Sequence, residues 1–139
     1  MNRSVRILLA EDNMADVWLI REALKRQSVE CLIDHFLTAE DAIRAIERCG
    51  ADGAAPPDLI LVDYNLPNGD GGDVLAAAAS NPHLAAVPRA ILSSHLQPHE
   101  RDRISSLGAA RFISKPADLH EFLAAVGATV NELVRPPST

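Results

Sequence analysis

The chain has 139 residues, of which 47% are hydrophobic and 23% are charged, and its formal net charge is −6. This length and composition fit one ordinary globular domain and argue against a disordered chain or a membrane protein. An acidic chain without a run of lysine or arginine is also a poor partner for nucleic acid. The apolar run behind the N-terminal arginines is too short for a signal peptide, so we expect a cytoplasmic protein.

Five short apolar runs of strand type alternate with five segments of helical periodicity. The runs cover Val5–Ala10 and residues 31–37, 59–62, 88–92 and 110–113, and the helices are expected over 16–27, from Thr38, over about 73–79, over 98–107 and from Asp118. Strict alternation of this kind predicts an α/β fold, a doubly wound parallel sheet with helices on both faces. The two cysteines, Cys31 and Cys49, lack the spacing of metal ligands, and we expect reduced structural thiols.

Charged and hydroxyl residues stand where the predicted strands end: Glu11, Asp12, Asp63, Ser93 and Lys115. In doubly wound sheets, ligands bind outside the carboxyl ends of the strands. The fold is therefore expected to bring these five side chains together, although they are far apart in the sequence.

Three carboxylates in one place need a cation, a lysine or raised pKa values. Mg²⁺ fits this set best, because it prefers oxygen ligands in octahedral geometry. A carboxylate beside Mg²⁺ can attack phosphorus when other groups carry the charge of the transferring oxygens. Asp63 is the expected nucleophile, Lys115 and Ser93 are placed to contact the phosphoryl oxygens, and the product would be an acyl phosphate.

With these residues in place, the chain resembles the receiver domain of two-component response regulators from Val5 to about Val134. The matching motifs are the pair Glu11-Asp12, the stretch Asp63-Tyr64-Asn65-Leu66-Pro67 with Asp70-Gly71 behind it, Ser93, and Lys115-Pro116. The resemblance implies a flavodoxin-like, five-stranded sheet of strand order 2-1-3-4-5 in a single domain. It also implies a receiver over residues 1–134 with a short tail at 135–139.

The resemblance assigns roles to individual residues. It implies that a sensor histidine kinase phosphorylates Asp63, and that Glu11, Asp12, Asp63 and the backbone carbonyl of Asn65 hold Mg²⁺. Ser93 and Phe112 would form the conformational switch, with Phe112 turning inward after phosphorylation. The Lys115–Pro116 peptide would be cis. The family's usual residues differ slightly, since the acidic pair begins with Glu and the switch positions hold Ser and Phe where Thr and Tyr are common.

Two further expectations concern partners and the lifetime of the phosphorylated state. Residues 11–24 resemble the stand-alone receivers that serve bacterial and cyanobacterial phytochrome kinases. Trp18 lies opposite Ile20 on a helical wheel, so we expect it to face solvent and contact the kinase. Asn65 and His95, each two residues past a site residue, are expected to tune how fast water removes the phosphoryl group.

Several alternatives stay open at this point. The kinase could be of a non-phytochrome type, or the chain could be an intermediate in a phosphorelay. A phosphatase of the haloacid-dehalogenase type would use the same nucleophile and Mg²⁺, but it wants an aspartate where this chain has Asn65. A flavin or nucleotide binder would want a glycine-rich or hydroxyl-rich loop after the first strand, and the acidic loop here lacks one.

The output is expected to come from a partner protein, from relay to another histidine or from a change in self-association, because no residues are left for a DNA-binding module. Apolar residues near the end of the last helix, such as Val134, also predict a homodimer through this end.

Overall fold

The computed structural model describes residues 4–27, 30–50, 54–115 and 118–134. Five strands and five α-helices alternate along the chain, with one short 3-10 helix between them. The elements are β1 (Val5–Ala10), α1 (Met14–Lys25), β2 (Cys31–Phe36), α2 (Ala39–Arg48), β3 (Leu59–Asp63), α3 (Gly71–Ala79), η1 (Pro82–Leu84), β4 (Arg89–Ser93), α4 (Pro98–Ser106), β5 (Ala109–Ser114) and α5 (Leu119–Leu133).

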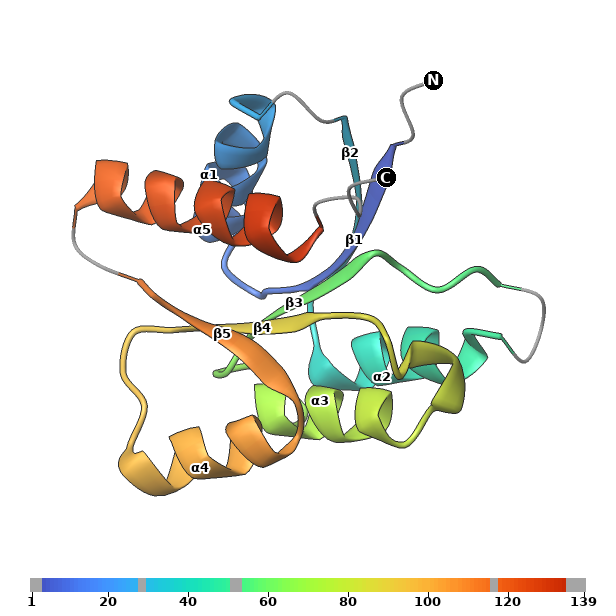
Figure 1. The fold of residues 1–139 in the computed structure, drawn as a ribbon. Coiled ribbons are helices and arrows are strands. Elements are labelled where there is room, and N and C mark those ends of the chain that lie inside the picture. The colour runs from blue at the N-terminus through green and yellow to red at the C-terminus, as the bar shows by residue number, and fades with distance from the viewer. Residues whose placement is uncertain (1–3, 28–29, 51–53, 116–117, 135–139) are drawn as a thin grey trace.

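The strands form one parallel sheet in the order β2-β1-β3-β4-β5. Figure 1 shows α1 and α5 on one face of this sheet and α2, α3 and α4 on the other. The predicted doubly wound fold and its strand order are therefore confirmed. The mostly apolar strands β3 and β4 lie inside the sheet, where both faces are covered, and every residue of these two strands is buried, including Arg89.

Two hydrophobic clusters hold the layers together. One lies under α1 and α5 and includes Ile20, Leu61 and Val126, and the other lies under α2, α3 and α4 and includes Ile46, Ile91 and Ile104. Alternate residues of the central strands feed the two clusters, because successive side chains of a strand point to opposite faces. The strands are thus held in place by a hydrophobic cluster on each face of the sheet, and so are the residues at their carboxyl ends.

Two helices begin earlier than the sequence pattern predicted. α1 begins at Met14, not at Asp16, because the Asn13 side chain caps it and accepts the backbone N–H groups of Ala15 and Asp16 at 2.9 and 3.2 Å. α3 begins at Gly71, not near residue 73, because Asp70 is its N-cap. Polar capping residues lie outside the apolar periodicity from which the helices were predicted.

The last helix begins after Asp118, as predicted, and its side chain accepts two N–H groups of the first turn. Val134, at the other end, packs against the cluster under α1 and α5. The apolar residue on which the predicted homodimer was based therefore serves the core of its own chain. Neither cysteine forms a disulfide, and none of the described helices is long and apolar enough to cross a membrane.

Candidate functional site

The candidate site lies at the carboxyl ends of the strands, the edge that lies to the left in Figure 1. Glu11 and Asp12 follow β1, Asp63 ends β3, Ser93 ends β4 and Lys115 follows β5. A backbone hydrogen bond of 2.9 Å from the Lys115 N–H to the Ser93 carbonyl joins the last two positions. The sheet thus brings all five predicted residues to one edge.

Lys115 is the centre of the charged group. Its Nζ donates to Asp63 Oδ2 at 2.7 Å and to the two carboxylate oxygens of Glu11 at 3.0 and 3.1 Å. It also donates to Asp16 Oδ2 at 2.8 Å. The lysine side chain is only 14% exposed, so these ion pairs are shielded from solvent far better than those on the surface.

The pKa values of both Glu11 and Lys115 are raised, which favours the neutral form of the glutamate and the charged form of the lysine. Burial raises the pKa of Glu11 to about 9, and the adjacent Asp63 carboxyl adds to the rise while Lys115 opposes it. Burial by itself lowers the pKa of Lys115, but its hydrogen bonds to Asp16 and Asp63 and the charge of Glu11 outweigh that effect, so the pKa lies above its ordinary value. The lysine therefore stays charged, whereas burial favours the uncharged form of Glu11.

Glu11, Asp12 and Asp63 offer ligand atoms that lie within 4.8 Å of one another. Glu11 and Asp63 are buried and Asp12 is exposed, so the group opens to solvent on one side. Carboxylate oxygens without histidine or cysteine suit a hard divalent cation such as Mg²⁺ or Mn²⁺. The residues present therefore fit the expected metal, whose positive charge would balance the negative charge of the buried carboxylates. His35 steadies this turn, since its ring nitrogen donates to the Glu11 carbonyl at 2.7 Å.

The loop after β3 sits close against the Asp63 carboxylate. The Asn65 N–H donates to Asp63 Oδ1 at 3.1 Å, and the Asn65 side chain lies at the surface. Gly71 allows α3 to begin here, because a Cβ on it would lie 2.7 Å from the Asp63 carbonyl oxygen. One carboxylate oxygen of Asp63 thus faces the lysine and the other faces the loop.

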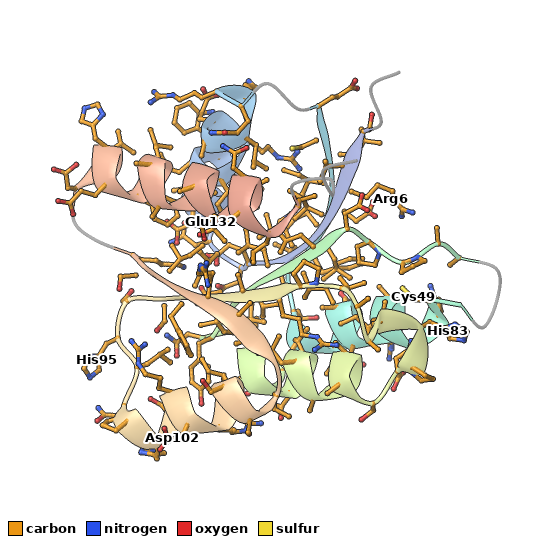
Figure 2. The ribbon with its side chains drawn as sticks, viewed as in Figure 1. Arg6, Cys49, His83, His95, Asp102 and Glu132 are labelled. Carbon is orange, nitrogen blue, oxygen red and sulfur yellow. The ribbon has the colours of Figure 1, made fainter. Side chains whose placement is uncertain are left out.

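Ser93 is buried, but its hydroxyl is engaged within its own loop. Its Oγ donates to the His95 carbonyl at 2.9 Å and accepts the His95 N–H at 3.1 Å. The His95 ring points away from the sheet in Figure 2 and lies 3.2 Å from the side chain of Gln97. The sequence placed His95 on the rim of the site, and the structure places its backbone there and its ring outside.

Phe112 lies half-buried against the cluster under α2, α3 and α4, and the Arg101 guanidinium stands 4.4 Å above the centre of its ring. α4, which carries Arg101, is joined to α3 by Arg103, whose guanidinium contacts Asp70 at 3.1 Å and Asp73 at 3.0 Å. The predicted switch aromatic is therefore covered by a helix that is itself bound to the segment after Asp63. The Lys115–Pro116 peptide, expected to be cis, lies outside the described residues.

Trp18 is 59% exposed on α1, while Ile20 is fully buried, as the helical wheel predicted. Met14, one turn earlier on the same face, is 60% exposed. Two large apolar side chains thus stand together at the start of α1.

Sequence reasoning missed two contacts of this region. Asp16 was assigned to the start of a helix, and Arg101 was assigned no role. The position of Asp16, in the first turn of the helix that follows the acidic pair, was a usable signal for the first, because that turn begins at the edge of the sheet where β1 ends. Nothing local in the sequence pairs Arg101 with Phe112.

The chain matches the family model for the response regulator receiver domain over residues 7–127. It is 37% identical over 102 residues to the response regulator Rcp1 of Synechocystis, covering 72% of this chain and 67% of that protein. The phosphorylated cyanobacterial phytochrome response regulator RcpA has a similar structure, with a TM-score of 0.87, 30% identity and 98% of each chain covered. The Mn²⁺-bound form of Rcp1 gives a TM-score of 0.84 with 26% identity, covering 96% of this chain and 97% of that chain. The chain belongs to the response regulator receiver family and is not a conventional enzyme.

Proposed function

We propose that this receiver takes a phosphoryl group from a sensor histidine kinase onto Asp63 and signals through a conformational switch. The observation that carries the proposal is the position of Asp63: its carboxylate lies 2.7 Å from the Lys115 ammonium and within 4.8 Å of the ligand oxygens of Glu11 and Asp12. A nucleophile, a fixed positive charge and a set of ligands for a divalent cation thus meet at one point.

The proposed transfer is a single displacement at phosphorus. A carboxylate oxygen of Asp63 forms the new P–O bond as the P–N bond to the kinase histidine breaks, and the departing imidazole keeps the bonding electron pair. Lys115 would donate to one transferring oxygen, and the Ser93 hydroxyl to another after leaving the His95 carbonyl. Mg²⁺, held by Glu11, Asp12, Asp63 and the Asn65 carbonyl, would neutralise negative charge on the phosphoryl group.

The switch would follow from the same rearrangement. When Ser93 turns toward the phosphoryl group, it vacates space beside β4, and Phe112 would turn inward to occupy it. Arg101 and α4 would then lose their contact with the ring, which changes the surface that α4 and β5 offer to a partner protein. Asn65 and, to a smaller extent, His95 would tune how readily water reaches the phosphoryl group.

A small phosphodonor tests the phosphoacceptor directly. The protein is incubated with Mg²⁺ and phosphoramidate, and its intact mass is measured over time. We expect one phosphoryl adduct that disappears in Asp63→Asn and persists in Asp102→Asn, a control on the exposed side of α4 (Figure 2). Absence of an adduct on the wild-type protein, or rapid catalytic release of phosphate, would contradict the proposal.

We further propose that the cognate kinase is a phytochrome, with the receiver acting in the cytoplasm and spanning residues 1–134 as one domain before a short tail. Similarity to Rcp1 and RcpA supports this partner. Phosphotransfer from a purified phytochrome kinase should be faster than from a non-phytochrome kinase, and return of the phosphoryl group to a second histidine protein would instead indicate a phosphorelay. Trp18→Ala should slow transfer from the kinase but not from phosphoramidate, because only the kinase needs the α1 surface.

The proposal includes a homodimer through the end of α5, where Val134 packs against the core of its own chain and the neighbouring surface would form the contact. Sedimentation of the protein with and without phosphoramidate would test it, with a dimer expected at least in the phosphorylated state.

A further inference from the structure

Asp16 stands in the charged group without belonging to the metal ligands. Its Oδ2 lies 2.8 Å from Lys115 Nζ, and its side chain is 23% exposed. The three carboxylates able to share an ion are Glu11, Asp12 and Asp63. The chain thus provides the lysine with one carboxylate that a cation would not occupy.

The contact is not explained by the needs of the helix. Asp16, Asp41 and Asp73 are each the third residue after an N-cap, in α1, α2 and α3. Asp73 closes a capping box by accepting the Asp70 N–H at 2.9 Å, and Asp41 lies exposed, 4.0 Å from Arg44 on its own helix. Asp16 sends its carboxylate across to the segment after β5, whereas the Asn13 side chain caps α1.

The lysine has more acceptors around it than it has hydrogens. An ammonium group carries three N–H donors, and four carboxylate oxygens lie within 3.1 Å of Nζ. Two of the three carboxylates, those of Glu11 and Asp63, also belong to the group that could hold a cation. When a cation takes oxygens of Glu11 and Asp63, Asp16 is the partner that the ammonium retains.

We propose that Asp16 is a positioning residue, which holds the Lys115 ammonium beside Asp63 while Glu11 and Asp63 bind the cation and Asp63 takes the phosphoryl group. The inference rests on the proposed phosphoacceptor role of Asp63. A lysine has a flexible four-carbon stem, so fixing its end group reduces the conformational freedom that must be lost on reaching the transition state.

The chain contains so few lysines that Lys115 can be observed individually by NMR. Lys25 and Lys115 are its only lysines, and Lys25 is 73% exposed on the outer side of α1. Protein labelled with ¹⁵N and ¹³C lysine therefore gives two side-chain NMR signals, of which Lys25 is an internal control. With Mg²⁺ and beryllofluoride, which mimics the phosphoryl group, we expect Lys115 to keep a slowly exchanging signal at the end of its side chain in the wild-type protein.

Asp16→Asn keeps the shape of the side chain and removes its charge. In this variant we expect the Lys115 signal to broaden or exchange rapidly under the same conditions, and phosphorylation by phosphoramidate to slow about threefold to tenfold. Asp41→Asn is the matched control, because it removes a carboxylate from the same helix position away from the site. It should leave both readouts unchanged. Circular dichroism of each variant checks that the fold is retained, and Asp16→Ser replaces Asp16→Asn should that protein not fold.

The outcomes separate the two proposals. If the wild-type protein forms no phosphoryl adduct, the proposed function fails. If the wild-type protein forms the adduct and Asp16→Asn matches it in rate and in the Lys115 signal, the role of Asp16 is overturned. A slower rate with an unchanged Lys115 signal would also overturn it, because the effect would then come from charge or helix stability alone.

Discussion

The two halves of the candidate site are held by different kinds of contact. In the half around the ends of β1 and β3, the Lys115 side chain reaches over from the end of β5 and joins Glu11, Asp16 and Asp63 through ion pairs that are largely buried. In the half formed by β4 and β5, the Ser93 hydroxyl bonds to the His95 backbone of its own loop, and Phe112 is covered by an exposed arginine. Removing one partner of a buried ion pair costs about 3–5 kcal/mol, while an exposed cation–π contact is worth about 0.5–1 kcal/mol. The first half is therefore suited to keep its geometry, and the second to change it at small cost.

Loss of Lys115 should have the largest effect, because it removes the common partner of the buried carboxylates. We expect Lys115→Gln to slow phosphorylation by phosphoramidate about a hundredfold, the size typical for one lost stabilising donor. Intact mass against time measures the rate. Lys25→Gln, on the exposed side of α1, is the control and should behave as wild type. A loss of less than about threefold would show that the first half does not depend on its lysine.

The pH dependence of metal binding tests the same half. Mg²⁺ must displace the proton from Glu11, whose pKa is raised to about 9, so affinity should rise with pH between 6 and 8 by up to about tenfold per unit. Titration calorimetry in two buffers of different ionisation enthalpy would detect the released proton. Asp63 and Lys115 contact the Glu11 carboxyl, Asp16 shares the same lysine, and His35 contacts the Glu11 carbonyl, so Glu11→Gln is needed as the reference. An affinity independent of pH, without proton release, contradicts the prediction.

The raised pKa of Glu11 also determines how the free energy of unfolding changes with pH. In the ion-free protein, folded Glu11 holds its proton up to a pKa of about 9, while the unfolded chain releases it near 4.5. The folded state then binds more protons than the unfolded state in this window, so the Glu11 contribution to the free energy of unfolding falls as pH rises. Mg²⁺ should accordingly raise the melting temperature more at pH 8 than at pH 6.

The second half should respond to Arg101. Arg101→Leu removes the cation above the Phe112 ring, which should favour the inward position of the ring about twofold to fivefold. NMR with labelled phenylalanine can follow the shift of the Phe112 signal with and without beryllofluoride. Asp102→Leu, the next residue on α4, is the matched control. If the two variants give the same Phe112 signal, Arg101 does not hold the ring.

The smallest effect is expected at His95. Its ring points away from the sheet, so His95→Ala should change the lifetime of the phosphorylated state by less than about twofold. Asn65, whose N–H touches the Asp63 carboxylate, offers the contrast. Asn65→Asp should shorten the lifetime more than His95→Ala, as loss of the phosphoryl adduct over time would measure. The reverse order would mean that the loop after β4 controls access of water.

The strands and the residues at their carboxyl ends can be predicted from the sequence. The strand ends could be predicted because a buried parallel strand appears as an apolar run that stops at a polar residue, as at Asp63 and Glu11. The capping residues Asn13 and Asp70 were overlooked because the helices were predicted from apolar periodicity, which begins only inside the helix. The short helix η1 was missed because one turn is too short to show a period.

By itself, the sequence determined which residues end the strands of an α/β sheet and therefore which could gather at its edge. The tertiary structure decided how their side chains are used: Asp16 reaches Lys115, the Ser93 hydroxyl turns to its own loop, and the His95 ring points outward. The physical reason is the separation along the chain between the residues that interact. Strand and helix patterns arise from neighbours along the chain, whereas the pairing of side chains separated by 99 residues, as in Asp16 and Lys115, depends on how the sheet and its helices pack.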